Sequence, residues 1–398
     1  MEKWIECKIS DIGTVVGGAT PSTKKPENYE NGDIAWITPK DLSSFSGRYI
    51  QRGERNITEI GLKSCSTQLL PKDTVLFSSR APIGYVAIAE NAVCTNQGFK
   101  SVIPNEDTDP IFLYYLLKYN KDKIESMGSG TTFKEVSGNT MKNIVVSVPQ
   151  DKQVQEKIAS VLDAIDEKIE ENERINNNLE QQAQALFKSW FIDYEPWDGS
   201  VPNSWNGGKL GDFAEIKRGG SPRPIQEYLS DSGLRWLKIS DVTSLQTPFI
   251  IDIKDHIIEA GLRKTVFLKA GSLVLSNSAT PGIPKILDVD SCIHDGWLYF
   301  PESKFSKEYL YLYFKYIRQQ LVNLSNGSVF NNLKTDILKG YPTILPDKET
   351  LRRFDDIVVP MFLQMQNLTR ESHKLADMRN ALLPKLMSGK LDVSDVDL

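Results

Sequence analysis

The sequence lacks the features by which membrane, secreted and zinc-binding proteins are recognised. It has no run of about 18 consecutive apolar residues, and residues 1–10 alternate polar with apolar side chains where a signal peptide would be apolar. Its four cysteines are scattered and form no Cys-x-x-Cys pair: Cys7, Cys65, Cys94 and Cys292. We therefore expect a cytoplasmic protein without membrane contact, whose cysteines are core or surface thiols.

The chain also lacks an excess of positive charge. Its net charge is −5, which at first sight argues against a nucleic-acid partner. The acidity is uneven, however, because residues 151–200 carry 5 basic and 12 acidic side chains, whereas residues 201–345 carry 17 basic and 14 acidic ones. A local basic surface outside residues 151–200 therefore remains possible.

What the sequence does contain is an internal repeat. Trp36–Asp41 returns as Trp236–Asp241, Cys94–Gly98 as Cys292–Gly296, and Phe112–Tyr115 as Tyr309–Leu312. The sequence of 398 residues is long enough for two or three domains. The repeat predicts two related globular domains over residues 1–150 and 201–345, each followed by a helical segment, 151–200 and 346–398.

The first helical segment, Asp151–Trp190, has apolar residues spaced as in a supercoiled helix. Its two core rows are Ile158, Ile165, Asn172, Leu179 and Leu186, and Val154, Val161, Lys168, Ile175 and Gln182. About 40 residues make a rod of roughly 60 Å, which is too long for one small domain. We therefore favour lengthwise pairing with a second helix over an ordinary core helix, with Asn172 fixing the register.

The second helical segment supplies a natural partner. Its apolar stripe is Leu351, Phe354, Val358, Met361, Met365, Leu368, Leu375, Leu382 and Leu386. Pro360 is expected to kink or break this helix near its first third. Because each long helix follows its own domain, we expect antiparallel pairing and a pseudo-two-fold arrangement.

Within the domains the pattern is that of an α+β fold with a mixed or antiparallel sheet. Strands are expected at Ile34–Ile37, Thr74–Phe77, Gly84–Ala89 and Ile144–Val148, and helices at Ile111–Lys118 and Lys307–Gln320. The fold class is thus two pseudo-symmetric domains separated by two long antiparallel helices, a coiled-coil spacer.

Catalytic signatures are missing. There is no G-x-x-x-x-G-K-[ST] loop, no Asn-Pro-Pro-Tyr or Asp-Pro-Pro-Tyr tetrapeptide and no Gly-x-Ser-x-Gly element. His294-Asp295 is the one suggestive pair, but the repeat replaces it with Asn96-Gln97, which has no acid–base capacity. We expect no catalytic residue and no metal site in this chain.

Three pairs of loops recur at corresponding places and carry residues that bind phosphates or base edges. Glycine lets backbone N–H groups approach a phosphate, and Arg, Asn, Ser and Thr pair with base edges and phosphate oxygens. The candidate DNA-binding residues in the first domain are Gly17, Gly18, Thr20, Ser78, Ser79, Arg80, Ser129, Thr131 and Thr132. Those in the second are Arg218, Gly219, Gly220, Ser221, Arg223, Ser276, Asn277, Ser278, Asn326 and Ser328. Plain surface turns inherited by duplication are the alternative.

The repeat, the paired helices and the two segments that close them, Leu186–Pro196 and Leu383–Leu391, resemble the specificity subunits of type I restriction-modification enzymes. The resemblance covers essentially the whole chain. It implies two target-recognition domains that each bind one half of a split site in double-stranded DNA, and helices that hold the modification subunits, two being expected. S-adenosylmethionine, ATP and Mg would then be bound by the modification and restriction subunits, and no cofactor by this chain.

The residues expected at helix-pair or partner-subunit contacts are Asn172, Leu179, Leu186, Phe187, Trp190, Phe191, Leu375, Leu382 and Leu386. The aromatic cluster of Trp190, Phe191, Tyr194 and Trp197 has two interpretations, a knot that anchors the helix end or a partner contact. Two other functions stay open: a coiled-coil adaptor that binds only proteins, and a single-chain enzyme with a duplicated domain.

Overall fold

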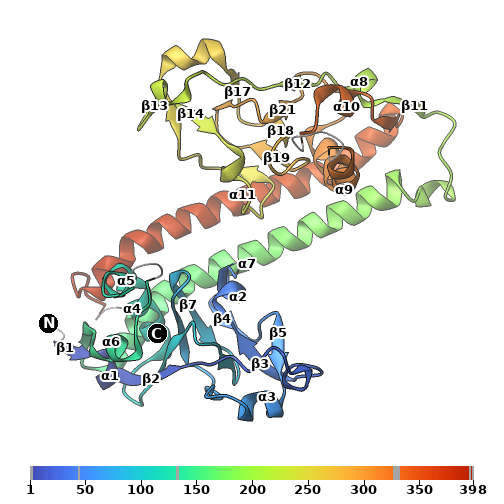
Figure 1. Ribbon diagram of the computed structural model, residues 1–398. Coiled ribbons are helices and arrows are strands. Elements are labelled where there is room, and N and C mark those ends of the chain that lie inside the picture. The colour runs from blue at the N-terminus through green and yellow to red at the C-terminus, as the bar shows by residue number, and fades with distance from the viewer. Residues whose placement is uncertain (1–2, 44, 131–133, 326–331, 394–395, 397–398) are drawn as a thin grey trace. The chain divides into compact units, whose positions relative to one another are not determined.

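The computed structural model describes residues 3–43, 45–130, 134–325, 332–393 and 396. Its contacts divide the chain into one unit of residues 1–170 and 374–398 and another of residues 171–373. Each unit combines a globular domain with a part of each of two 40-residue helices, α7 (Lys152–Phe191) and α11 (Lys348–Met387) (Figure 1). The long helix that the heptad pattern predicts is thereby confirmed.

The first globular domain mixes short strands and helices. Its strands are β1 (Trp4–Lys8), β2 (Gly13–Gly17), β3 (Ile34–Ile37), β4 (Tyr49–Ile50), β5 (Arg55–Ile57), β6 (Val75–Ser79), β7 (Ile83–Ala89), β8 (Cys94–Thr95), β9 (Lys100–Pro104) and β10 (Val145–Pro149). Its helices are α1 (Ile9–Ile12), the 3-10 turn η1 (Pro26–Asn28), α2 (Pro39–Ser43), α3 (Glu59–Lys63), α4 (Pro110–Tyr119), α5 (Lys121–Ser126) and α6 (Gly138–Asn143).

The second globular domain follows the 3-10 turn η2 (Glu195–Trp197). Its strands are β11 (Asn206–Lys209), β12 (Lys217–Arg218), β13 (Leu229–Ser230), β14 (Leu234–Leu237), β15 (Phe249–Ile250), β16 (His256–Ile257), β17 (Val266–Leu268), β18 (Leu273–Ser276), β19 (Pro284–Leu287), β20 (Ser291–Ile293), β21 (Trp297–Tyr299) and β22 (Pro342–Leu345). Its helices are α8 (Leu210–Phe213), η3 (Ile225–Glu227), η4 (Ile239–Asp241), η5 (Glu259–Lys264), α9 (Lys307–Ser325) and α10 (Thr335–Lys339).

The two domains share one strand order. A five-stranded sheet runs β2-β9-β6-β7-β4 in the first domain and β12-β21-β18-β19-β15 in the second. The first and last strands of each domain pair antiparallel, as β1 with β10 and β11 with β22. The order β5-β3-β8 of the small sheet returns as β16-β14-β20, which β13 and β17 extend. This agreement confirms the internal repeat at the level of the fold.

Both parallel and antiparallel pairs occur, as expected of a mixed sheet. Strand β4 lies parallel to β7, and its counterpart β15 lies parallel to β19. The predicted strands coincide with β3, β6, β7 and β10, and the predicted helices with α4 and α9. Helix α4 is buried along Phe112–Leu117 because its aromatic and leucine side chains form the centre of the domain core.

Helix α11 differs from the expectation, since it continues without a break through Pro360. A proline removes one backbone N–H, here the one that would bond the carbonyl of Asp356. Pro360 lies on the exposed side of the helix, while Val358 and Phe362 are buried in the core of the second domain. Burial of that stripe offsets the loss of one hydrogen bond, so the helix continues.

The two long helices pair in both units, and their contacts in the second unit show that they run antiparallel. In the second unit, Asn172 of α7 bonds Glu371 of α11 and Asn176 bonds Thr369, so numbers rise on one helix as they fall on the other. In the first unit, the guanidinium of Arg379 from α11 donates to the carboxylate of Asp166 from α7. Across the part of the chain that the structure describes, every helix is too short or too polar to span a lipid bilayer.

Candidate functional site

In the first domain the predicted loops converge on one segment, Thr95–Gly98. The N–H of Ala19 donates to the carbonyl of Thr95 at 3.0 Å, and the hydroxyl of Thr20 contacts the side chain of Gln97. The N–H of Ser79 donates to the carbonyl of Gly98 at 2.7 Å. Two of the three loops singled out by the repeat therefore rest directly on a fourth.

The third loop joins through its return strand. Ser129 and Glu135 exchange two backbone hydrogen bonds, which close the base of the loop, and Val136 then donates to the carbonyl of Ser79 at 3.0 Å. Thr131 and Thr132 lie outside the described residues. The loop base thus lies beside the Ser78–Arg80 loop, which itself rests on Thr95–Gly98.

The second domain repeats this arrangement around Ile293–Gly296. The N–H of Gly220 donates to Ile293 at 3.3 Å, and the hydroxyl of Ser221 donates to the carboxylate of Asp295 at 2.7 Å. Asn277 donates to the carbonyl of Gly296 at 2.8 Å. In the sequence this fourth loop is only a weak catalytic candidate. The glycine that both copies retain, Gly98 and Gly296, is the signal that could have indicated its structural role.

The fourth loop holds its shape through an acceptor side chain two residues before its glycine. Asn96 accepts from the N–H of Gly98 at 2.8 Å, and His294 accepts through Nδ1 from the N–H of Gly296 at 2.6 Å. Burial lowers the pKa of His294 more than the nearby Asp295 raises it, which favours the neutral ring. A neutral histidine and an asparagine can therefore both accept the hydrogen bond from the glycine N–H. This shared structural role requires no acid–base chemistry at the position.

The glycines of the first loop pair allow the backbone of that loop to lie close to the backbone of the fourth loop. A Cβ on Gly18 would lie 2.2 Å from the carbonyl oxygen of Thr95, and one on Gly219 would lie 2.2 Å from that of His294. Gly17 is exposed at the end of β2. The structural counterparts are therefore Gly18 and Gly219, which let the first loop rest on the fourth.

The serines that end β6 and β18 lie inside the protein. Ser78 donates to the carbonyl of Pro82 and accepts from the N–H of Tyr85, both at 2.8 Å. Ser276 donates to Thr280 at 2.6 Å and accepts from Ile283 at 2.8 Å in the same way. Both hydroxyls are fully buried and stabilise the turn that follows the strand.

The residues that follow these serines are buried as well. The hydroxyl of Ser79 donates to Gly98 at 3.1 Å, and the amide of Asn277 donates to the carbonyl of Asp295 at 3.3 Å. Arg80 is more exposed and forms an ion pair with Glu135 at 3.6 Å. Among the strand-end residues, Arg80 and its counterpart Ser278 therefore reach the surface.

Two arginines surround the acidic tip of the fourth loop in the second domain. Arg218 donates through Nε to the backbone carbonyl of Asp295 at 2.5 Å, and its Nη2 lies 3.7 Å from the carboxylate. Arg223 donates to the same carboxylate at 3.2 Å. Although burial alone would raise it, the pKa of Asp295 is held below its usual range by the hydrogen bond from Ser221 and by the two arginines.

A cavity of about 840 Å3 opens between these loops in the second domain. Trp236 and His294, with ring centroids 6.1 Å apart, form an aromatic wall, and Arg223, Lys238 and Ser278 add polar groups. Asn326 and Ser328 lie outside the described residues. The surface therefore combines exposed cations, hydroxyls and a concave aromatic site.

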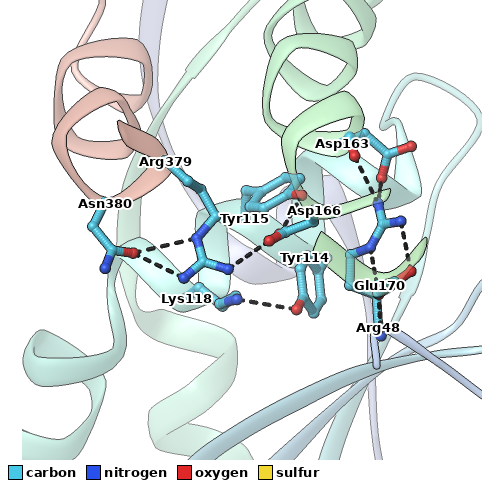
Figure 2. Close-up of polar contacts among 9 residues, drawn as sticks. All are labelled: Arg48, Tyr114, Tyr115, Lys118, Asp163, Asp166, Glu170, Arg379 and Asn380. Atoms are coloured by element: carbon cyan, nitrogen blue, oxygen red, sulfur yellow. Dashed lines mark hydrogen bonds and ion pairs between the residues drawn. The ribbon is translucent and has the colours of Figure 1, made fainter. Parts of the chain in front are cut away.

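A buried polar cluster attaches the first domain to the long helices (Figure 2). Arg48, only 3% exposed, donates to both carboxylate oxygens of Glu170 at 2.9 and 3.0 Å and pairs with Asp163. Asp166, also buried, accepts from the hydroxyl of Tyr115 at 2.7 Å and bonds the guanidinium of Arg379 from α11. Arg48 could not be predicted from the repeat, because Pro248 stands at the corresponding place in the second domain.

The second domain contacts the helices of its own unit through other residues. The hydroxyl of Tyr311 and the amine of Lys315 bind the carboxylate of Glu180 at 2.6 and 2.7 Å. Arg370 and Asp288 form a second ion pair at 2.6 Å. Each domain therefore has its own set of charged contacts with the helices.

The helix-pair residues predicted from the heptads lie largely at buried positions. Asn172 is fully buried and donates to Glu371 at 2.9 Å and to Ser372 at 3.3 Å. Phe187 and Phe191 are buried, with Leu179, Leu186 and Trp190 packed against their cluster. In the first unit Leu386 is buried and Leu382 packs beside it, whereas Leu375 is half-buried.

The aromatic residues at the end of α7 pack on one another and on the second domain. Trp197 meets Trp190 with ring centroids 6.0 Å apart and Trp205 at 4.9 Å, and Tyr194 meets Trp205 at 5.9 Å. Phe191 contacts Phe354 of α11 at 4.8 Å. These contacts favour the interpretation as a knot that anchors the helix end.

Comparisons with known proteins agree on one family. The model of the type I restriction modification DNA specificity domain matches residues 1–181 and again residues 202–364. The MjaIX specificity subunit of Methanocaldococcus jannaschii is 33% identical over 99% of this chain and 94% of its own length. The HindI specificity subunit of Haemophilus influenzae is 25% identical over 98% of this chain and 92% of its own.

A solved structure has a similar fold. The S subunit of a type I restriction-modification system from M. genitalium superposes with a TM-score of 0.63 at 16% identity, covering 97% of this chain and 96% of that one.

Proposed function

This chain belongs to the type I restriction-modification DNA specificity family, and on that premise we propose that each of its two domains binds one half of a bipartite DNA target. The observation that carries the proposal is the convergence of recurring loops at the same place in both domains, four loops in the first domain and three in the described residues of the second. Thr20 meets Gln97 in one domain and Ser221 meets Asp295 in the other. Two similar surfaces in one chain suit a target with two half-sites.

The proposed DNA-binding surface consists of the exposed and half-buried polar residues of these loops. In the first domain they are Thr20, Arg80, Gln97 and Ser129, and in the second Arg218, Ser221, Arg223, Ser278 and Asp295. The buried Ser78, Ser79, Ser276 and Asn277 would act indirectly by shaping the loops. Thr131, Thr132, Asn326 and Ser328 stay candidates from their place in the sequence.

Arginine is suited to both parts of DNA binding. Its guanidinium donates in a fixed fork that fits a phosphate or the O6 and N7 atoms of guanine. The side chain of Arg223 is 78% exposed and that of Arg218 is 52% exposed. Both are held near Asp295 before DNA arrives, which lowers the entropy lost when they order on a groove.

The long helices are the proposed spacer and the docking site of the modification subunits. Helix α11 carries an apolar groove of about 510 Å3, which is lined by Val359, Pro360, Leu363 and Leu368. Leu363 is 51% exposed within this groove, and a contiguous apolar surface of this kind is typical of a partner contact. We place methyl transfer, with S-adenosylmethionine, on those modification subunits, and ATP, Mg and cleavage on the restriction subunits.

The test is to mix the purified chain, alone and with its modification subunits, with DNA and S-adenosylmethionine. We expect methylation of a specific sequence only when the modification subunits are present. Methyl transfer by the chain alone would instead indicate a single-chain enzyme. If the modification subunits methylate DNA without sequence preference, and to the same extent with and without the chain, the chain is an adaptor that binds only proteins.

A further inference from the structure

The fourth loop has a common scaffold in both domains but a different residue at its tip. The scaffold is the acceptor side chain folded over a glycine, Asn96 over Gly98 and His294 over Gly296. A Cβ on Gly98 would lie 2.9 Å from Oδ1 of Asn96, and one on Gly296 would lie 2.1 Å from Cε1 of His294. The loop is therefore fixed on both sides of the one residue that differs in charge, 97 in the first domain and 295 in the second.

That residue faces solvent and is steadied by a hydroxyl from the first loop. Gln97 is exposed and contacts Thr20, while Asp295 is 36% exposed and accepts from Ser221 at 2.7 Å. The two partners of each contact are 77 and 74 residues apart in the sequence. A side chain that is ordered yet accessible loses little entropy when it binds a ligand.

Gln97 and Asp295 differ in what they can recognise. A glutamine amide carries a carbonyl acceptor and two donors, so after the contact with Thr20 it keeps capacity for both N6 and N7 of adenine. An ionised carboxylate only accepts, and its natural base partner is the N4 amino group of cytosine.

The surroundings of Asp295 complete a donor and acceptor pattern. Arg218 and Arg223 place guanidinium donors 3.7 and 3.2 Å from its carboxylate. In the major groove a G·C pair presents the O6 and N7 acceptors of guanine beside the N4 donor of cytosine. An acceptor flanked by arginine donors is the complement of that edge.

We propose that residues 97 and 295 are equivalent base-reading positions, Gln97 contacting adenine of an A·T pair and Asp295, with Arg218 or Arg223, contacting one G·C pair. This inference rests on the proposed function, since it assigns base preferences within the two DNA-binding surfaces. It also explains why the scaffold recurs while its tip does not: the shared part positions the contact, and the variable part selects the base.

The test is a reciprocal exchange, Gln97→Asp and Asp295→Gln, made separately in the full chain assembled with its modification subunits. Each complex selects duplexes from a randomised library. We expect Asp295→Gln to change the preference at one position of one half-site from G·C toward A·T, by roughly 5- to 150-fold, the range for one good base contact. Gln97→Asp should change one position of the other half-site in the opposite direction.

Controls separate a base contact from loop support. Asp290→Gln removes a carboxylate of the same domain whose ion-pair partner is Lys269, at 2.8 Å, and not a residue of the recurring loops. This substitution should leave the selected motif unchanged. Asp295→Asn keeps the shape of the side chain, and so covers the case in which Asp295→Gln does not fold. It should lose the G·C preference at the same position.

The outcomes distinguish this inference from the proposed function. If wild type selects a motif and both Gln97→Asp and Asp295→Asn select the same motif with the same strength, the inference is wrong and the proposed function stands. A uniform loss of affinity without a change at one position would assign these residues to loop support and likewise overturn it. If wild type selects no motif, the proposed function fails and the inference with it.

Discussion

Arg48 binds Glu170 through two hydrogen bonds of 2.9 and 3.0 Å, and this pair joins the first domain to α7 (Figure 2). The arginine is 3% exposed, whereas Glu170 is one-third exposed, so the pair lies at the edge of the buried junction. Tyr115 and Arg379 meet on Asp166 nearby. These charged contacts add to the apolar packing of α7 on the first domain, whose core includes Ile158 and Leu162 of that helix.

We predict that Arg48→Ala lowers the free energy of unfolding of the first unit by about 3 kcal/mol, because it leaves carboxylates at the junction without their cation. Denaturant unfolding followed by circular dichroism measures the change. Arg352→Ala is the matched control, since its pairs with Glu349 and Asp356 are exposed, and it should change stability by less than about 1 kcal/mol. Equal effects of the two substitutions would contradict the role of Arg48.

Lys285 predicts a pH dependence of the second domain. Its amine is buried and donates to the carbonyls of Leu245, at 2.7 Å, and Thr247, and burial lowers its pKa to about 8. The unfolded chain, with a pKa near its usual value of 10.5, binds more protons between these limits. Because stability rises with pH wherever the unfolded state binds more protons, this lysine destabilises the fold below pH 8 and ceases to do so as pH rises toward 10.5.

The measurement compares the unfolding free energies of wild type and Lys285→Met over the same pH range. Their difference removes the contribution of the other titrating groups. We expect the unfolding free energy of wild type to increase relative to the variant from pH 8 to 10, with a slope of up to about 1.4 kcal/mol per pH unit. A difference that stays constant over this range would show that the amine titrates normally.

Shortening the helix pair should shorten the distance between half-sites. Deleting Glu173–Asn176 removes about 6 Å of α7, and deleting Thr369–Ser372 removes the facing turn of α11. We expect the double deletion to change the spacer of the methylated motif while leaving both half-site sequences intact. Either deletion alone should weaken methylation more, because it shifts the antiparallel register of the pair. An unchanged spacer with full activity would show that the helices do not set the distance.

Exchanging one domain should change one half-site. Replacing residues 201–345 with the corresponding segment of a relative alters every proposed DNA contact of the second domain and none of the first. We expect the methylated motif to keep one half-site and the spacer length. A change in both half-sites would mean that the two domains do not bind DNA independently. The reverse exchange of residues 1–150 is the matched control.

Much of the fold could be predicted from the sequence, because each pattern that indicates a strand or helix occurs twice, once in each domain. The strand at Ile34–Ile37 and the helix at Lys307–Gln320 are each supported by a counterpart, and both are present. Pro360 was misleading, since burial of its neighbours outweighs one lost hydrogen bond. Arg48 could not be identified from the repeat, because its counterpart in the second domain is Pro248.

The candidate site was predictable only in part, for a physical reason. The loops were found one by one, but their convergence depends on contacts such as Ser221 with Asp295, which the sheet brings together across 74 residues. Burial of Ser78 and Ser276 was equally hidden, because a serine at a strand end looks the same in sequence whether its hydroxyl faces solvent or the next turn. Side-chain direction, and not residue type, separates the two cases.

Sequencing the methylated positions in DNA treated with the assembled complex shows whether the two domains bind two half-sites. We expect an interrupted motif, with two short specific half-sites separated by a fixed number of unread base pairs. Their centres should lie near one duplex turn apart, about 34 Å, if both domains enter the major groove from one side. A continuous motif without a spacer would show that the two domains do not bind separate half-sites.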